Sequence, residues 1–243
     1  MSITYQDIIR LVIRVIDYSH KKKIAKKLKI VLGREMLNVL DVGAHHGESI
    51  SFFLKNFNVN KIYSFEPSKP NYKMLCQNMN LRKEQIKKKI QLYNYGLGLL
   101  KTKTFLNQFK ESSSSTIQNL NLDSNYMKKK MKILNLNQQN MYEKVEIEVD
   151  TLKNFLNNFS STVDILKIDT EGYELNVIKG AEEKIKIIKC IYFEHHYDDM
   201  ITKDYTFSDI NDYLVKKNFK KIFKIKMPLR KTFEYIFVNN LFN

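Results

Sequence analysis

Residues 37–47, with the sequence LNVLDVGAHHG, decide the fold class of this chain. They begin with a short and nearly continuous apolar run, 37–42, which is typical of a strand buried on both faces of a parallel sheet. A turn rich in small residues follows at once. Small residues here let the backbone approach a ligand at the carboxyl end of the strand. The stretch therefore predicts the first strand and the ligand-binding turn of an open α/β sheet.

The residues that follow repeat this pattern. We expect a helix over 48–57, a strand over 61–65, a helix from about residue 70, and a strand over 90–95. Such an alternation of strands and helices predicts a doubly wound parallel sheet.

The C-terminal half predicts further strands and helices. Strands are expected at 145–149, 163–168 and 190–193, and helices near 152–159 and 207–217. The two last β-rich runs, 220–226 and 233–238, have no helix between them and predict an antiparallel pair at the sheet edge. The predicted fold class is thus α/β: a Rossmann-like, mostly parallel, doubly wound sheet with an antiparallel edge strand, plus N-terminal helices.

Two segments fall outside this alternation. Residues 3–30 predict one or two helices with a basic face, so that 1–36 form an N-terminal helical extension and 37–243 the main domain. The extension is interpreted as a helical cap, with a peripheral membrane contact as the alternative. Residues 101–144, which contain a four-serine run, predict a loop, with 117–144 as a lid or insertion.

The composition favours a cytoplasmic globular protein. The chain has 243 residues and two cysteines, both in apolar runs, and no signal peptide or membrane span is predicted. Its formal charge of +15 suggests nucleic acid as a partner, but only five of the 41 basic residues are arginine. Because the lysines are also spread over many segments, we interpret them mainly as solvated faces.

The turn after the first strand suggests the kind of ligand. Its glycines, Gly43 and Gly47, lack the middle glycine of the dinucleotide fingerprint G-x-G-x-x-G, which seats a pyrophosphate. A compact turn without that seat suits a nucleoside without phosphates, such as S-adenosylmethionine. The candidate contacts in this turn are Asp41, Gly43, Ala44 and Gly47, and a plain strand–helix turn is the alternative.

The ends of the next two strands offer further cofactor contacts. Glu66 ends the second strand, where an acidic side chain can accept hydrogen bonds from both ribose hydroxyls. Asn94 and Gly96 end the third strand, at a position that borders the adenine ring in such a fold. A tight turn is an equal interpretation of the latter pair.

Acidic and imidazole side chains follow the two later strands. Asp169 and Glu171 come directly after the buried strand 163–168, and His195 and His196 follow the strand 190–193. These four are the candidate catalytic residues, because the carboxyl ends of parallel strands meet at one edge of the sheet. Adjacent histidines on a strand would point apart, so at most one is expected to face the site. A metal site is an open alternative.

Together these motifs resemble the FkbM-type methyltransferase family. The resemblance rests on the turn 41–47, Phe65-Glu66-Pro67, the serine-rich segment 112–116, Val149-Asp150-Thr151-Leu152 and 164–174, followed by Gly180-Ala181. It covers roughly residues 37–196. The family usually has Asn where this chain has His45, so His45 receives no role.

The resemblance implies a class I methyltransferase fold and transfer of a methyl group from S-adenosylmethionine to an acceptor hydroxyl, on a sugar, glycan or other small molecule. Asp169, His195 and His196 are the candidate bases for the hydroxyl proton, and Glu171 would orient the acceptor or bind a divalent ion. Three other functions stay open: an RNA methyltransferase, a nicotinamide-dependent oxidoreductase, and a non-catalytic, membrane-associated binding protein.

Overall fold

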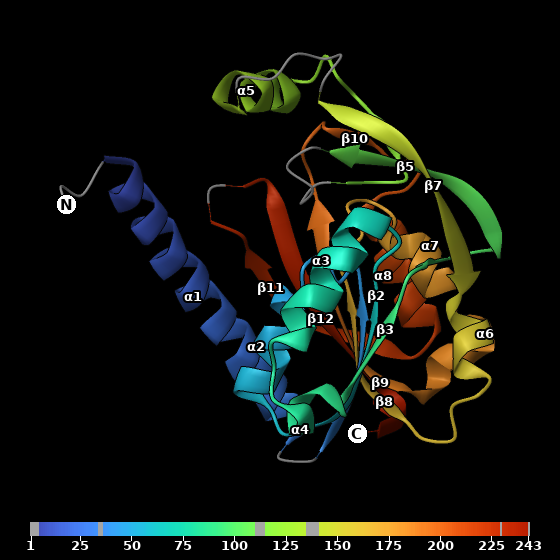
Figure 1. The fold of residues 1–243 in the computed structure, drawn as a ribbon. Helices are drawn as coiled ribbons and strands as arrows, with labels where there is room; N and C mark the ends of the chain where they lie inside the picture. Colours follow the sequence, from blue (N-terminus) through green and yellow to red (C-terminus); the bar gives the residue numbers. More distant parts are fainter. Residues whose placement is uncertain (1–4, 34–35, 110–114, 135–140, 229, 243) are drawn as a thin grey trace.

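A seven-stranded sheet forms the centre of the molecule (Figure 1). The computed structural model describes residues 5–33, 36–109, 115–134, 141–228 and 230–242. The strand order is β11-β12-β9-β8-β1-β2-β3. These strands are β1 (Leu37–Val42), β2 (Val59–Phe65), β3 (Ile90–Tyr93), β8 (Val163–Ile168), β9 (Ile188–His196), β11 (Phe219–Lys226) and β12 (Thr232–Asn239).

The sheet confirms the predicted fold class. The strands β3, β2, β1, β8 and β9 pair in parallel, and β12 pairs antiparallel with both β9 and β11. The antiparallel pair β11–β12 lies at the sheet edge, as the missing helix between its strands predicted. The strand that runs against all the others is β12, second from the edge.

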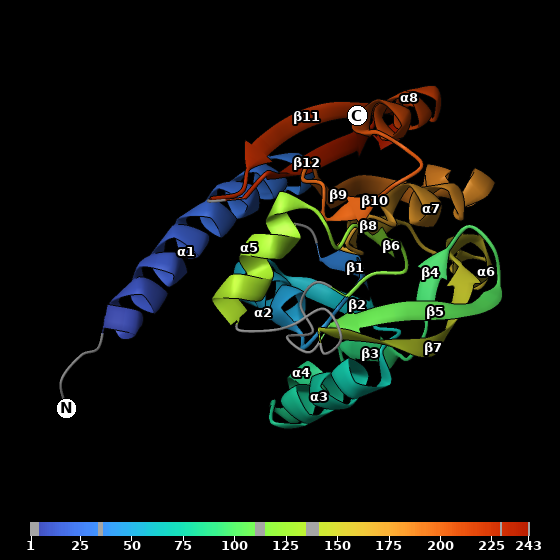
Figure 2. The same ribbon diagram turned by 90° about the horizontal axis from the view of Figure 1, so that it is seen from above.

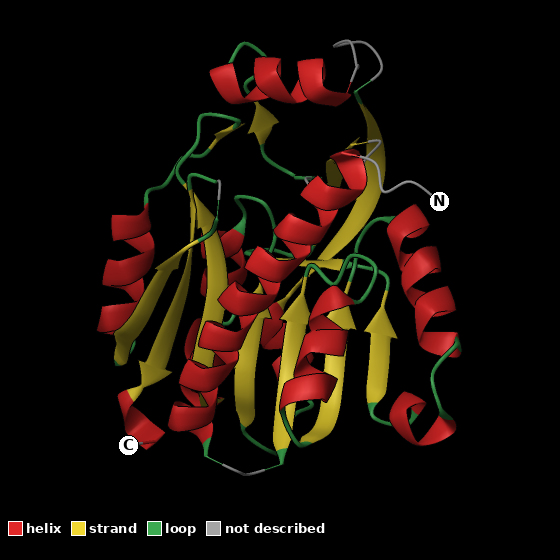
Figure 3. Cartoon of the chain, turned by 90° about the vertical axis from the view of Figure 1, so that its left-hand side faces the viewer, coloured by secondary structure: helices red, strands yellow, loops and turns green. Residues whose placement is uncertain are grey.

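Helices cover both faces of the sheet, and each face has its own apolar core (Figure 3). Side chains of α1 (Tyr5–Leu32), α2 (Glu48–Asn56) and α3 (Lys69–Asn80) pack on one face. Those of α6 (Leu152–Leu156), α7 (Glu174–Lys179) and α8 (Phe207–Lys216) pack on the other. Two short helical elements, α4 (Glu84–Lys87) and the 3₁₀ helix η2 (Glu182–Ile187), precede β3 and β9; a 3₁₀ turn, η3 (Asn240–Phe242), follows β12.

The buried strand β12 shows why a continuous apolar run marks a strand covered on both sides. Tyr235 and Phe237 belong to one core, whereas Ile236 between them belongs to the other. Successive side chains of a strand point to opposite faces, so both faces of a sandwiched strand must be apolar.

The segment 101–144, predicted as a loop, contains regular structure in its described residues. Strand β5 (Thr102–Phe109) pairs antiparallel with β7 (Tyr142–Thr151), and β4 (Gly96–Gly98) pairs with β7 in parallel. Strand β6 (Asn119–Leu120) pairs with β10 (Ile201–Thr202), and helix α5 (Asn125–Leu134) follows β6. Residues 110–114 and 135–140, including three of the four serines, lie outside the described residues.

Helix α5 lies beyond the carboxyl ends of the central strands (Figures 1 and 3). A small apolar cluster holds it there: Met127 of α5 packs with Phe109 at the end of β5 and with Met200 and Ile201 near β10. The sequence pattern missed this unit because its hydrophobic residues are mostly methionines spaced among Asn and Lys.

The N-terminal extension is one long helix, α1, whose N-terminal end reaches away from the sheet (Figures 1 and 2). Its C-terminal half packs on the sheet through Ile24, Leu28 and Leu32. None of the helices in the described part of the chain combines the length and apolar character needed to cross a bilayer.

Candidate functional site

The glycine turn after β1 lies directly against the end of β8. A Cβ atom on Gly43 would lie 1.8 Å from the backbone oxygen of Asp169, and the φ of Gly43 is +82°. A side chain here would clash with backbone atoms, so only glycine fits without a shift of the chain. The amide of Asp169 also donates a hydrogen bond to Val42 O at 2.9 Å. The predicted glycine turn and the predicted acidic motif are therefore in direct contact.

A buried carboxylate and a buried lysine support this contact from within. Asp41 is fully buried and accepts hydrogen bonds from the hydroxyls of Ser49 (2.6 Å) and Ser64 (3.2 Å). The ammonium of Lys167 lies 3.3 Å from a carboxylate oxygen of Asp41 and 3.3 Å from one of Asp169. It also donates to Gly43 O at 3.2 Å. Asp41 thus supports the glycine turn from the buried side of the sheet.

The two carboxylates keep Lys167 charged. Burial by itself favours the neutral amine, but the nearby Asp169 and Asp41 outweigh it and raise the pKa of Lys167 above its ordinary value. Lys167 lies in the segment 164–174 on which the family resemblance rests, but the sequence did not indicate that its side chain joins the ends of β1 and β8.

Glu66 lies at the end of β2 with only 5% of its surface exposed. Its two carboxylate oxygens accept hydrogen bonds from the amides of His45 (2.9 Å) and Ser68 (3.0 Å). Burial raises its pKa to about 7, although these hydrogen bonds act in the opposite direction. Each oxygen of a carboxylate held in this way still has a lone pair that can accept a hydrogen bond from one hydroxyl of a vicinal diol.

Asn94 supports the Glu66 turn from behind. Its amide nitrogen donates to Glu66 O (2.9 Å) and to Pro67 O (3.3 Å). It is not among the residues that line the cavities described below, whereas Gly96, two residues further on, lines the first of them. Of the two predicted cofactor contacts, Gly96 therefore lies in the cavity wall, whereas Asn94 lies behind it.

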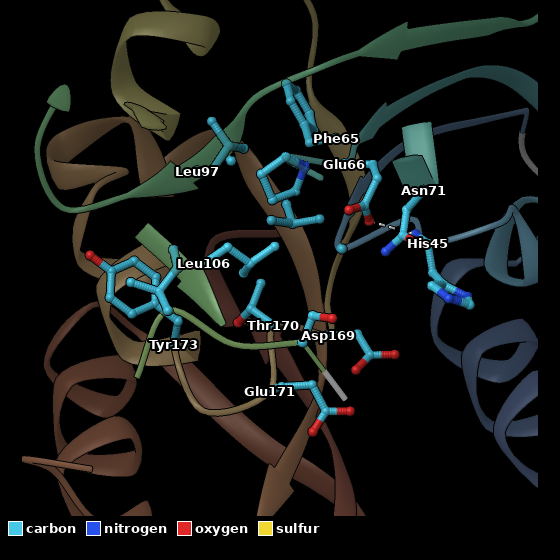
Figure 4. A pocket seen from close by; sticks show the side chains of 16 residues that line it. His45, Phe65, Glu66, Asn71, Leu97, Leu106, Asp169, Thr170, Glu171 and Tyr173 are labelled. Carbon is cyan, nitrogen blue, oxygen red and sulfur yellow. Dashed lines mark hydrogen bonds between the residues drawn. The ribbon is translucent and has the colours of Figure 1, made fainter. Parts of the chain in front are cut away.

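A first cavity, called here the inner cavity, lies at the carboxyl ends of β1, β2 and β8 (Figure 4). Apolar side chains such as Leu97, Leu106 and Tyr173 lie on one side of it, and Glu66, Asn71 and His45 on the other. Its full lining is Val42, Gly43, His45, Phe65, Glu66, Pro67, Asn71, Gly96, Leu97, Leu106, Ser115, Ile117, Asp169, Thr170, Glu171 and Tyr173.

A second cavity, the outer cavity, lies between this edge of the sheet, α1 and the β11–β12 connection. It shares Gly43, His45, Asp169 and Glu171 with the inner cavity. Its other lining residues are Asp17, His20, Lys21, Ala44, Glu48, Ser49, Phe52, Phe53, Lys167, Tyr192, Glu194, Met227, Arg230 and Glu234. The two candidate catalytic carboxylates therefore stand where the cavities meet.

The turn that carries these carboxylates is tightly held. Glu171 and Gly172 both have positive φ, +49° and +94°. Thr116 donates its hydroxyl hydrogen to Glu171 O at 2.6 Å, which joins the end of the serine-rich segment to the turn. The buried carboxylate of Glu174 accepts from the Gly172 amide at 2.7 Å. Such bonds hold a backbone conformation that non-glycine residues rarely adopt.

Three acidic groups surround His196. Its Nε2 atom lies 3.0 Å from Glu171 Oε2 and 3.1 Å from Glu194 Oε1, and its Nδ1 atom lies 3.3 Å from Asp198 Oδ2. Burial disfavours the charged imidazole, but Glu171, Asp198 and Glu194 outweigh it and raise the pKa of His196 well above its ordinary value. Burial and the nearby Asp169 raise the pKa of Glu194 to about 8. We therefore treat His196 as protonated and Glu194 as largely neutral at pH 7.

His195 points to the opposite face of β9, as adjacent residues of a strand must. Its Nδ1 atom lies 3.7 Å from Glu174, and its ring packs against Tyr197, Tyr205 and Phe207. Burial lowers its pKa. Of the two histidines, only His196 contacts a carboxylate that lines the cavities.

Sequence reasoning missed the residues that close the outer cavity. Asp17, His20 and Lys21 come from α1, and Arg230 and Glu234 from the C-terminal hairpin. The ring of His20 is paired with the Glu234 carboxylate, which also accepts a hydrogen bond from Tyr192. No local pattern could have linked residues more than two hundred positions apart.

This edge of the sheet has the chemistry to seat a nucleoside and to accept a proton beside it. A buried carboxylate suits the ribose diol, apolar side chains suit the base, and two carboxylates stand at the junction with a second cavity.

This chain is similar to known proteins in sequence and in fold. A sequence model described as the methyltransferase FkbM domain matches residues 41–221, about three quarters of the chain. The crystal structure of the methyltransferase FkbM from Methylobacillus flagellatus KT is similar, with a TM-score of 0.54 and 15% identity. The similarity covers 83% of this chain but 43% of that one, so this chain spans less than half of its length.

An rRNA methylase from Streptococcus thermophilus gives a TM-score of 0.49 at 10% identity, over 89% of this chain and 94% of that one. A search of curated proteins finds no match. At 15% identity the likeness to the FkbM crystal structure bears on the fold alone. The sequence match carries the assignment, and it shows that this chain belongs to the FkbM methyltransferase domain family.

Proposed function

We propose that this chain transfers a methyl group from S-adenosylmethionine to a hydroxyl of a small, polyhydroxylated acceptor such as a sugar or glycan unit. The observation that carries the proposal is the pair of carboxylates, Asp169 and Glu171, at the junction of the inner and outer cavities. A methyl donor in one cavity and an acceptor in the other would meet there.

The lining of the inner cavity fits the cofactor. Glu66 would accept hydrogen bonds from the ribose hydroxyls, and Phe65, Leu97 and Leu106 offer apolar surface to the purine ring. The absence of a side chain on Gly43 lets the end of β8 approach the turn and places Asp169 at the junction. S-adenosylmethionine, when bound, supplies a methyl group that is already activated for transfer.

The protein's part is then to position the acceptor and remove its proton. We assign the proton to Asp169, which lines both cavities and whose carboxylate Lys167 holds in place at 3.3 Å. Glu171, held by His196 at 3.0 Å, would orient the acceptor through a hydrogen bond. His196 is a poor candidate for the base, because its raised pKa means that it already carries a proton.

The charge of the outer cavity favours an uncharged acceptor over a polyanion. With Glu194 largely neutral, the lining of this cavity still includes the acidic side chains Asp17, Glu48, Asp169, Glu171 and Glu234, against the cations Lys21, Lys167 and Arg230. An RNA backbone would bring further negative charge to this surface, at a cost in free energy. Once the charges that line the outer cavity are considered, the net charge of +15 on the whole chain is only weak support for an RNA acceptor.

The first test is cofactor binding. S-adenosylhomocysteine should raise the melting temperature of the protein, since a ligand that binds only the native state adds about 2.7 kcal/mol at 100 times its dissociation constant. NAD should not, and Glu66→Ala should remove the shift. A shift with NAD alone, or no shift with any ligand in folded protein, would contradict the proposal.

The second test is transfer of labelled methyl groups to a panel of neutral glycosides, sugar phosphates and RNA. Asp169→Asn should lower kcat by about 10²- to 10⁴-fold without loss of cofactor binding, as expected for removal of a general base. Glu171→Gln should act mainly on the KM of the acceptor. Transfer to RNA alone would replace the sugar acceptor by a nucleic acid.

A further inference from the structure

One more group of side chains in this region has chemistry that methyl transfer does not use. His45, His46 and Glu48, on the turn between β1 and α2, place three potential metal-ligand atoms within 4.8 Å of one another. Among the described residues no other set of three histidine, cysteine or acidic side chains converges in this way. In particular, Glu171, Glu194 and His196 are not such a set.

The distances fit a first-row metal ion. His45 Nδ1 lies 3.4 Å from Glu48 Oε1. Bonds of about 2.1 Å in a tetrahedral site put neighbouring ligand atoms about 3.4 Å apart. The remaining separations, up to 4.8 Å, close by rotation of the Glu48 side chain, 57% of which is exposed, and of the two imidazole rings, which must turn towards one ion.

The two imidazoles are already side by side. Their ring centroids are 3.7 Å apart and their planes differ by 19°. This stacking holds both rings over the same turn, and neutral imidazole is the commonest protein ligand of zinc and its neighbours. The backbone contributes to it, since His45 has a φ of +48° and its amide is anchored to Glu66.

The surroundings also favour a cation. His45 and Glu48 line the outer cavity, whose wall also carries the acidic side chains of Asp169 and Glu171. Two imidazoles and one carboxylate fill three positions of a divalent ion and leave at least one open. An ion held there would face the cavity assigned above to the acceptor.

We propose that His45, His46 and Glu48 bind one divalent first-row transition-metal ion, with zinc as the reference ion, at the rim of the outer cavity. The inference does not depend on the methyl acceptor or on S-adenosylmethionine. An open coordination position would be available to an oxygen of a bound molecule.

Equilibrium dialysis of the full chain, without an affinity tag, against Zn²⁺ tests the site, and the visible absorption of Co²⁺ reports its ligands. One ion per chain is expected. His46→Asn and Glu48→Gln should each weaken binding by at least about 100-fold, because loss of a supporting residue outside the ligand shell already costs about 10- to 100-fold. Neither side chain lines the inner cavity, so the S-adenosylhomocysteine thermal shift should persist in both variants.

The matched control is Glu84→Gln, because Glu84 is also an exposed carboxylate in the first turn of a helix and is paired with a lysine, Lys87. It should bind Zn²⁺ as the wild type does. No binding of Zn²⁺ or Co²⁺ by folded protein would overturn the proposal, and so would binding that both ligand variants retain. Metal binding without any cofactor shift would keep this site and reject the methyltransferase assignment.

Discussion

The inner and outer cavities meet at four shared residues, but different parts of the chain build them. Every residue that lines the inner cavity lies between positions 42 and 173, inside the segment 41–221 that the family shares. The outer cavity also uses Asp17, His20 and Lys21 from one end of the chain, and Met227, Arg230 and Glu234 from the other.

The difference teaches how the two sites are specified. Loops at the ends of β1, β2 and β8 form the base of the inner cavity, and the order of motifs in the sequence is enough to bring these parts together. Leu106 of β5 and Ile117 add a wall that the sequence did not predict. Packing of α1 against the C-terminal hairpin shapes the outer cavity, and no local motif encodes that contact. We therefore expect changes at the inner cavity to affect cofactor binding, and changes at the outer wall to leave it intact.

The largest expected effect is that of Gly43→Ala, at the point where both cavities meet. A Cβ atom 1.8 Å from Asp169 O would force the β1 and β8 ends apart. With the positive φ, we expect a loss of about 3–4 kcal/mol in unfolding free energy and loss of S-adenosylhomocysteine binding. Urea denaturation and calorimetric titration measure both.

The matched control for that variant is Gly33→Ala. Gly33 has a similar φ of +67°, but a Cβ atom at this position would have no atom of the described residues within 4 Å, apart from its neighbours in the chain. It should lose only about 1 kcal/mol. Equal losses of unfolding free energy at the two glycines would mean that the close approach of Gly43 to Asp169 does not contribute to the effect.

Disruption of the α1 contact should separate the two cavities. His20→Ala leaves the buried Glu234 carboxylate without its imidazole partner, so we expect a loss of about 1–3 kcal/mol. Amide exchange in the C-terminal half of α1 should accelerate, and S-adenosylhomocysteine affinity should stay unchanged. Lys21→Ala, at the next and exposed position, should change stability by less than about 0.5 kcal/mol. If His20→Ala also lost cofactor affinity, the proposed independence of the inner and outer cavities would be wrong.

The inner cavity should respond to pH through Glu66. Its pKa is raised to about 7, and the ionised carboxylate is the form that accepts two ribose hydrogen bonds. Affinity for S-adenosylhomocysteine should therefore rise roughly tenfold between pH 6 and pH 8. Glu66→Gln should bind weakly with a much flatter pH profile.

Stability should respond to the same group with the opposite sign. A carboxyl group with a raised pKa in the folded state stabilises the protein below its unfolded pKa, and this contribution is lost as pH rises towards about 7. Relative to Glu66→Gln, the unliganded wild type should thus lose stability over this range. A constant difference between the two proteins would show that folding does not shift the pKa of Glu66.

The smallest expected effect concerns Asn94, which lies just behind the wall of the inner cavity. Asn94→Ala removes two hydrogen bonds to the Glu66–Pro67 backbone, and we expect a loss of about 1 kcal/mol with a modest fall in cofactor affinity. Asn60→Ala removes a comparable but exposed hydrogen bond to Asn38 and serves as the control. Equal results for both would place Asn94 outside the cofactor site.

The sequence predicted the parts of the fold that local patterns determine. The buried strands, the helices between them and the late antiparallel pair follow from hydrophobic runs and turn residues, and the structure confirms them. The segment 101–144 was predicted as a loop because its apolar residues are sparse, yet β5 and α5 form there through pairing with β7 and packing on Phe109.

The sequence alone determined the position of the inner cavity. Asp41, Gly43, Glu66 and Asp169 stand at strand ends, and a parallel sheet brings such ends to one edge regardless of the rest of the chain. Only the tertiary structure decided which face of β9 each histidine occupies and how Lys167 links two strands. It also decided that α1 closes the outer cavity, because the pairing of His20 with Glu234 depends on packing between distant segments, which leaves no periodic trace in the sequence.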